Sequence, residues 1–185
     1  MSYIAKKPNF TNYQFNIDTT GFTKQVVSTT LVGYSGTEID YTPTSGASKV
    51  IYEVNLDISW HPDGAGSYPC TRVQYSDDNG SSWNTVSGSE VIDGTGSKQI
   101  DYDYYNMNYT FMLDSWTGSR KIRLAGRSYS TSNEFTIGFQ YLASNSEGPA
   151  SCPHVSIYSV IPWVILDKKK LYIVKKVVQV FKQYL

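Results

Sequence analysis

The sequence predicts an all-β protein built as a sandwich or a barrel. Gly, Ser, Thr, Asn and Tyr are abundant whereas Leu and Ala are scarce, a balance that favours strands and turns over long helices. Strand-like segments separated by turn residues recur from residue 21 to residue 160. The clearest of them, residues 50–60, alternates large apolar with mostly polar side chains, which is the period of a half-buried strand. At about 3.3 Å per residue this strand would span about 36 Å, a length that suits a sandwich or barrel.

Ahead of the long strand, the sequence predicts an extended arm and two shorter strands. Residues 1–20 are polar and aromatic with several Asn, which indicates an arm of the kind that lies on a neighbouring molecule. Residues 21–41 are expected to form two strands broken at Gly33-Tyr34-Ser35-Gly36, and residues 42–49 a turn. In the long strand itself, alternate side chains are expected to line the core: Val50, Tyr52, Val54, Leu56, Ile58 and Trp60.

After the long strand, the sequence predicts a loop, a hairpin and further strands. Residues 61–67 are dense in turn formers. Residues 71–87 are expected to form a hairpin, because Asn79-Gly80 tolerates the positive φ angles of tight turns. Later strands are expected at residues 110–113, 120–128, 135–141 and 154–160.

The last segment, residues 161–185, is predicted to be a basic amphipathic tail that follows a sandwich domain of residues 21–160. It holds six Lys and one Asp, against ten Lys+Arg and fifteen Asp+Glu in residues 1–160. Apolar residues spaced by three and four favour a short helix, whereas the many β-branched residues favour a strand. Five lysines are candidates for attachment to an acidic partner, the alternative being a solvated face: Lys168, Lys169, Lys170, Lys175 and Lys176.

No cofactor or metal site is expected. Cys70 and Cys152 have neither metal-ligand spacing nor a redox motif, and both a disulfide and two buried thiols fit the sequence. His61 and His154 stand alone, without a catalytic or metal-ligand pattern. The N-terminus lacks the apolar core of a signal peptide, and the longest apolar stretch near the C-terminus is too short to span a bilayer.

One hairpin motif, Ser76-Asp77-Asp78-Asn79-Gly80-Ser81-Ser82-Trp83, fits the Asp-box pattern and resembles the turns of sialidase-like β-propellers. Its residues Ser76, Asp78, Gly80 and Trp83 are expected to act structurally. Asp78 would accept hydrogen bonds from turn amides, Gly80 would be left-handed, and Trp83 would plug the base of the hairpin. Propellers repeat the box once per blade, whereas this sequence holds one copy, so sialidase catalysis is not expected.

Paired acids are the remaining catalytic candidates. Asp101 and Asp103 would share one face of a strand about 7 Å apart, and glycosidases use two carboxylates. Solvated acids fit the same pattern, and no phosphate-binding loop or nucleic-acid module is recognisable. The chain is therefore predicted not to be an enzyme and not to bind nucleic acid.

A tyrosine-rich stretch is the candidate contact surface for a glycan or a protein partner. Tyrosines offer flat apolar faces with polar tips, which suits recognition of sugars or proteins. The alternative is a strand that packs half of these rings in the core. The residues are Tyr102, Tyr104, Tyr105 and Tyr109.

Three segments resemble jelly-roll domains of bacteriophage fibre and other virion proteins. Residues 41–51, Tyr-Thr-Pro-Thr-Ser-Gly-Ala-Ser-Lys-Val-Ile, are similar to the lead-in of a long strand in those domains, and residues 116–124 and 154–158 are similar to marine phage structural proteins. The likeness spans residues 38–160. It implies an antiparallel jelly roll of the tumour-necrosis-factor and complement type, which associates as trimers around aromatic interfaces. The basic tail departs from that pattern.

The resemblance implies a non-enzymatic virion structural protein, assembled in the host cytoplasm as a homotrimer. It would be a capsid decoration protein or part of a tail fibre or other appendage, with major capsid or tail proteins as partners. The alternative is a receptor-binding module for host attachment, which would recognise host-surface polysaccharide through the tyrosine-rich stretch.

Overall fold

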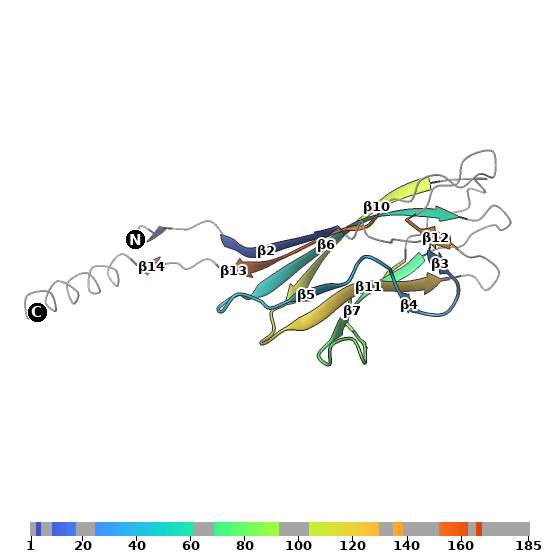
Figure 1. Cartoon of the computed structure of the whole chain (residues 1–185). Coiled ribbons are helices and arrows are strands. Elements are labelled where there is room, and N and C mark those ends of the chain that lie inside the picture. Colours follow the sequence, from blue (N-terminus) through green and yellow to red (C-terminus); the bar gives the residue numbers. More distant parts are fainter. Residues whose placement is uncertain are drawn as a thin grey trace, which may run out of the picture.

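The computed structural model of the chain describes residues 3–4, 9–17, 25–60, 69–92, 104–129, 135–138, 152–162 and 166–167. These residues form two antiparallel sheets of six strands each, packed as two layers, and a separate two-stranded pair (Figure 1). All the elements in the described ranges are strands, which confirms the predicted all-β class. No helix in these ranges has the length and apolar character needed to cross a membrane.

The first sheet is built around the predicted long strand. Its strands are β2 (Asn9–Ile17), β3 (Gln25–Val27), β6 (Lys49–Trp60), β10 (Tyr104–Asp114), β12 (Phe135–Ile137) and β13 (His154–Ile161). β6 pairs with β10 on one side and with β13 and then β12 along the other. β2 continues the sheet beyond β13, and β3 continues it beyond β12.

The second sheet is built around the pair β7–β11. Its strands are β4 (Val32–Gly33), β5 (Ile39–Tyr41), β7 (Pro69–Ser76), β8 (Asn84–Thr85), β9 (Val91–Ile92) and β11 (Arg120–Ser128). β4 and β5 both pair with β11, and β8 and β9 both pair with β7.

The strand order is that of a jelly roll. Three pairs of strands share a neighbour and so occupy one position each: β4 with β5, β8 with β9, and β12 with β13. β2 and β3 also occupy one position, because they pair with β13 and β12 respectively, so the described strands of the two sheets fill eight positions. Numbered along the chain, these positions run 1-8-3-6 in the first sheet and 2-7-4-5 in the second. This is the double Greek-key arrangement of a jelly-roll sandwich, as predicted.

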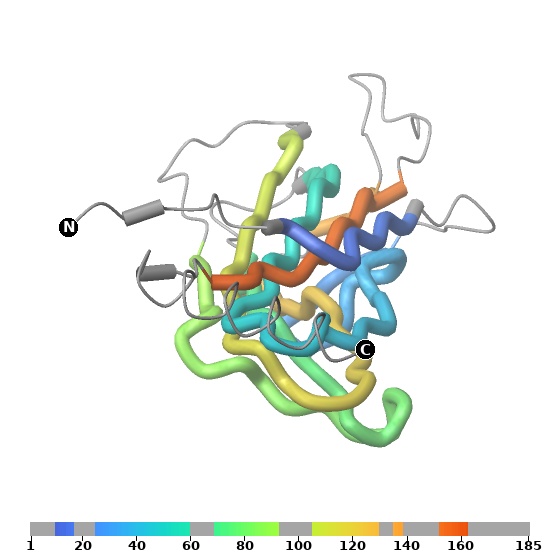
Figure 2. Tube along the Cα trace, turned by 90° about the vertical axis from the view of Figure 1, so that its left-hand side faces the viewer, coloured from blue at the N-terminus to red at the C-terminus, as the bar shows by residue number. Residues whose placement is uncertain are grey.

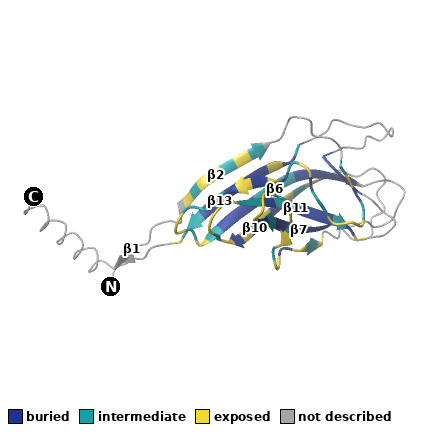
Figure 3. Cartoon of the chain, turned by 60° about the horizontal axis from the view of Figure 1, so that its bottom comes forward, coloured by how far each residue is buried: buried dark blue, intermediate teal, exposed yellow. Residues whose placement is uncertain are grey.

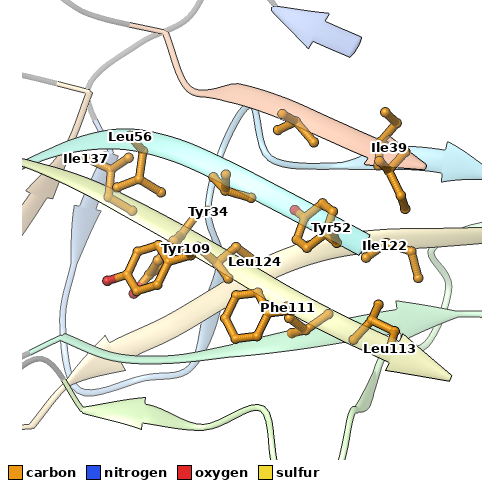
Figure 4. Packing of buried hydrophobic residues seen from close by; sticks show 14 of the residues in the cluster. Tyr34, Ile39, Tyr52, Leu56, Tyr109, Phe111, Leu113, Ile122, Leu124 and Ile137 are labelled. Atoms are coloured by element: carbon orange, nitrogen blue, oxygen red, sulfur yellow. The ribbon is translucent and has the colours of Figure 1, made fainter. Parts of the chain in front are cut away.

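The core lies between the two sheets, and β6 supplies much of it (Figure 4). Five of the six β6 side chains predicted to face inward are buried: Val50, Tyr52, Val54, Leu56 and Ile58. The side chain of the sixth, Trp60, is outside the described residues. Ile122 and Leu124 of β11 meet them from the second sheet. The hydroxyl of Tyr52 also donates a hydrogen bond to the Thr37 carbonyl oxygen, 2.5 Å away, which joins the layers by a polar contact.

The predicted hairpin turn is confirmed in its backbone. Asn79 and Gly80 have φ angles of 59° and 91°, the left-handed region that tight hairpin turns require. β7 and β8 flank the turn and pair through Gln74 with Thr85 and Tyr75 with Asn84.

The predicted arm needs a correction, because part of residues 1–20 belongs to the sandwich. Residues 9–17 form β2, which pairs with β13 along its length (Figure 2). The sequence of β2 does not alternate between apolar and polar residues as a regular strand does. The reason is that Asn12 has a φ of 54° and the register of pairing shifts opposite it, between Ile157 and Ser159. Such a β-bulge inserts an extra residue and breaks the alternation of faces.

Two short strands near the ends of the sequence lie side by side. β1 (Tyr3–Ile4) pairs with β14 (Leu166–Asp167), so part of the predicted tail is strand. Residues 168–185 are outside the described ranges, and with them the five candidate lysines and the choice between helix and strand for that stretch.

Candidate functional site

An exposed cluster of aromatic rings lies on the outer face of the first sheet. Phe10, Tyr13 and Phe15 of β2 are 64%, 63% and 55% exposed. They contact two rings of β13, Tyr158 and His154. Phe10 meets Tyr158 edge-on at 5.4 Å, Tyr13 stacks on Tyr158 at 5.8 Å, and Phe15 meets His154 edge-on at 6.1 Å between ring centroids. We call these five residues the aromatic platform; Figure 3 shows the exposed stretches of β2.

The bulge at Asn12 brings the three β2 rings to the same face. Strict alternation would put Phe10 and Tyr13, three residues apart, on opposite faces, and the extra residue of the bulge corrects this. Two hydrogen bonds between Asn12 and residues 41–42 hold the bulge. The Tyr41 hydroxyl donates to the Asn12 carbonyl oxygen at 3.0 Å, and the Asn12 side-chain amide donates to the Thr42 carbonyl oxygen at 2.7 Å.

Beside the platform an open groove of about 280 Å³ crosses the first sheet from β2 to β10. Its lining is Phe15, Glu53, Val54, Asn55, Asn108, Tyr109, Thr110, His154 and Ser156. Glu53 lies between platform and groove, where its carboxylate accepts hydrogen bonds from the Ser156 hydroxyl at 2.9 Å and the Tyr158 hydroxyl at 3.3 Å. Burial, followed by the negative charge of Glu53, raises the pKa of the Tyr158 phenol, so this hydroxyl keeps its proton at neutral pH.

Asparagine side chains form the other wall of the groove. Asn55 donates to Asn106 at 2.8 Å and to Asn108 at 2.6 Å. Asn106 donates back to Asn55 at 3.1 Å and to the Asp57 carboxylate at 2.8 Å, and Asn108 donates to Asn106 at 3.1 Å. We call Asn55, Asn106 and Asn108 the asparagine cluster; it fixes the direction of amide groups at the rim of the groove.

Flat apolar rings next to oriented amides and a carboxylate suit a ligand with one apolar face and a rim of hydroxyl groups. In the described ranges no three side chains of His, Cys, Asp or Glu come together as metal ligands would. The candidate acids Asp101 and Asp103, and His61, are outside those ranges, so the structure does not bear on them. His154, predicted to stand alone, is part of the platform.

The Asp-box residues lie on the second sheet and satisfy their own turn. The Asp78 carboxylate accepts hydrogen bonds from the Ser76 hydroxyl at 2.6 Å and from the Ser82 hydroxyl and amide at 2.6 and 2.9 Å. These bonds lower the pKa of Asp78 to about 2. The Gly80 amide donates to the Ser76 hydroxyl oxygen at 2.7 Å. The Trp83 ring lies against the turn, where a Cβ added to Gly80 would be 3.6 Å from it, and the Arg123 guanidinium carbon lies 3.7 Å from the centroid of the same ring.

In the tyrosine-rich stretch the structure describes the side chains of Tyr105 and Tyr109 only, and of these Tyr109 lies in the core. Tyr109 is only 6% exposed and stacks on Phe111 at 6.2 Å, because odd-numbered side chains of β10 point between the sheets. Tyr105, at another odd position, is half-buried. Tyr102 and the side chain of Tyr104 are outside the described residues.

The two cysteines are free thiols, Cys70 buried and Cys152 half-buried, so the predicted alternative of a disulfide is not what the structure has. They lie away from the groove lining.

Sequence reasoning missed the platform and Glu53. A signal is present in the sequence, because three aromatic residues fall within six positions of β2: Phe10, Tyr13 and Phe15. The polar residues around them favour an arm over a strand. Glu53 was only one of several polar residues on the outward face of the long strand.

Comparisons with known proteins do not assign a family. No family model matches the chain, and no curated protein matches it. Among solved structures, one similar chain is the carbohydrate-binding module TmCBM61, determined in complex with β-1,4-galactotriose. The match has a TM-score of 0.21 and 14% sequence identity, and it covers 85% of this chain and 89% of that chain.

Proposed function

We propose that this protein is a non-catalytic glycan-binding module and that its site is the outer face of the first sheet. The observation that supports this most directly is the aromatic platform, whose β2 rings are more than half exposed beside a groove lined with polar groups. A pyranose ring has an apolar C–H face and a rim of hydroxyls. The platform suits the apolar face, and the amides, Ser156 and Glu53 suit the hydroxyls.

Exposure of large rings is costly unless a partner covers them. An aromatic side chain buries about 150–250 Å² when it is covered. A ligand that covers several exposed rings of the platform would therefore gain a large favourable free energy of binding. The platform is also held in place before any ligand arrives, because ring contacts across β2 and β13 and the fixed bulge at Asn12 orient it. Preorganisation of this kind lowers the entropic cost of binding.

Affinity measurements on immobilised polysaccharides test the proposal. Tyr13→Ala and Phe15→Ala should each weaken binding about tenfold, about 1.4 kcal/mol, because each removes one ring from the platform. Ile92→Ala is the matched control, since Ile92 is 57% exposed but lies on β9 of the second sheet. Binding that is equal in wild type, Tyr13→Ala and Phe15→Ala would rule out this face as the site.

A second candidate function is self-association through the same rings, as a virion structural protein that forms homotrimers would need. The exposed Phe10, Tyr13 and Phe15 favour it as well, since aromatic side chains are enriched at subunit interfaces. Light scattering separates the two functions. A trimer mass that falls to the monomer mass in Tyr13→Ala favours assembly, whereas a wild-type monomer that binds polysaccharide favours glycan recognition. The virion location, the capsid or tail partners and the absence of catalysis stay predictions.

A further inference from the structure

We infer that the groove of the first sheet holds one linear glycan chain that crosses the strands from β2 to β10 and contacts about three consecutive sugar units. This inference rests on the proposed glycan-binding function, and it adds the direction of the bound chain and the length of ligand that the site recognises. It comes from the register of four paired strands and from the residues that line the groove.

The first wall of the groove is a straight row of residues, one from each of four neighbouring strands. Ser156 of β13 pairs directly with Phe15 of β2 on one side and with Glu53 of β6 on the other. Glu53 in turn pairs with Thr110 of β10. All four residues line the groove. Because residues in register lie side by side across a sheet, this row runs perpendicular to the strands.

The second wall is a parallel row, two positions further along the strands. His154 of β13 pairs with Asn55 of β6, and Asn55 pairs with Asn108 of β10. These three residues also line the groove. Side chains two residues apart share one face of a strand at a spacing of about 7 Å, so both rows stand on the outer face of the sheet with the groove between them.

The floor of the groove is the sheet itself. The row between the two walls contains Val54 of β6 and its partner on β10, Tyr109, whose side chains are 2% and 6% exposed and belong to the core. Alternation sends these two side chains to the inner face, so their backbone lies at the bottom of the groove that they help to line. Two walls and a backbone floor form a channel that directs a bound chain across the strands.

The length of this channel sets the length of the ligand. Four neighbouring strands are separated by three gaps of about 4.8 Å, so the first wall is about 14 Å long, comparable with about three linked pyranose rings. The chemistry changes along it. The exposed ring of Phe15 stands at the β2 end, Glu53 and Ser156 lie in the middle, and the exposed polar side chains of Thr110 and Asn108 lie at the β10 end. One sugar unit therefore stacks on a ring, and the units beyond it form hydrogen bonds.

The experiment combines the length of the ligand with the position of a substitution. The full chain is titrated by calorimetry with a series of oligosaccharides, from the monosaccharide to the hexasaccharide, made from the polysaccharide that it captures best. The affinity of the wild type should rise with each unit up to about three and then level off, because further units lie beyond the channel. Phe15→Ala should weaken the binding of every length, since the unit on this ring is common to all of them.

Substitutions at the β10 end should act only on the longer ligands. Asn108→Ala, and Thr110→Val, which keeps the shape of the side chain, should each weaken trisaccharide binding about fivefold by removing a hydrogen bond and leave disaccharide binding unchanged. Asn84→Ala is the matched control, because Asn84 is exposed on β8 of the second sheet.

Three results count against the inference. Equal affinities for the disaccharide and the trisaccharide, or wild-type trisaccharide binding in both Asn108→Ala and Thr110→Val, would overturn it while the binding of sugar to the platform, and with it the proposed function, stands. A chain that runs along β2 instead would be recognised by a loss of affinity in Phe10→Ala that grows with ligand length. Capture of no glycan by the wild type would remove the proposed function, and the inference with it.

Discussion

The hydroxyl of Tyr41 connects the stability of the sandwich to the shape of the platform. Its ring is fully buried, and its hydroxyl lies 2.7 Å from the Ser159 hydroxyl of β13 and 3.0 Å from the Asn12 carbonyl oxygen of β2. Burial raises the pKa of Tyr41, so the phenol stays protonated and can donate to Asn12 while it accepts from Ser159. The change Tyr41→Phe removes these two bonds and keeps the ring, including its edge contact with Trp116.

The loss of unfolding free energy expected for Tyr41→Phe follows from the polar groups that lose a hydrogen-bond partner. No cavity opens, so the cost is that of two lost hydrogen bonds and a partly buried carbonyl at Asn12 without this donor. Each neutral hydrogen bond contributes about 0.5–1.5 kcal/mol net, so the free energy of unfolding should fall by about 1–3 kcal/mol. Ser159 keeps one partner, because its hydroxyl oxygen still accepts from the Thr44 amide at 2.9 Å, which argues against a larger loss.

Urea unfolding followed by tryptophan fluorescence measures this change. Tyr13→Phe is the control, since its hydroxyl is on an exposed ring and its removal should cost less than about 0.5 kcal/mol. Tyr41→Phe should also weaken polysaccharide binding modestly, because the bulge that aligns the β2 rings loses one of its two supports. An unfolding curve for Tyr41→Phe that overlies the wild type would refute the reasoning about the bulge.

Two further predictions concern the core and the hairpin. Leu124→Ala, at a fully buried position between the sheets, should lower the free energy of unfolding by about 2–5 kcal/mol through lost burial and a cavity, measured by the same urea titration; a loss below about 1 kcal/mol would contradict the described core. The folded-state pKa of Asp78, about 2, is below its value in an unfolded chain, about 3.9, so its contribution to stability is present above about pH 4 and is lost as the pH falls toward 2. Asp78→Asn should therefore flatten the dependence of stability on pH in that window, and identical pH profiles for both proteins would contradict the hydrogen bonds described for Asp78.

The sequence was most informative where one face of a strand is buried and the alternation is regular. In β6 the inward set from Val50 to Ile58 could be named because the polar outward residues of a central strand mark the period. The turn at Asn79-Gly80 was equally accessible, since few residues accept a positive φ. Both features depend on local chemistry alone.

The platform depends on features that no local pattern reveals. The bulge at Asn12 destroys the alternation of β2, and the hydrogen bonds that hold it come from Tyr41 and Thr42, about 30 residues away in sequence. Tyr158 joins the platform through pairing of the first and last strands of the sandwich. For the tyrosine-rich stretch, composition left a contact surface and a half-packed strand both open, and the parity of β10 positions places Tyr109 in the core.

The central claim is that the outer face of the first sheet holds a glycan, and nuclear magnetic resonance titration tests it most directly. The full chain would be titrated with an oligosaccharide of the polysaccharide it captures best. The account predicts that perturbed amide signals cluster on β2, β13 and the middle of β6 and β10, around Phe15, Glu53 and Asn108. Perturbations confined to the second sheet, around Trp83 and Arg123, or no perturbation by any captured sugar, would contradict it.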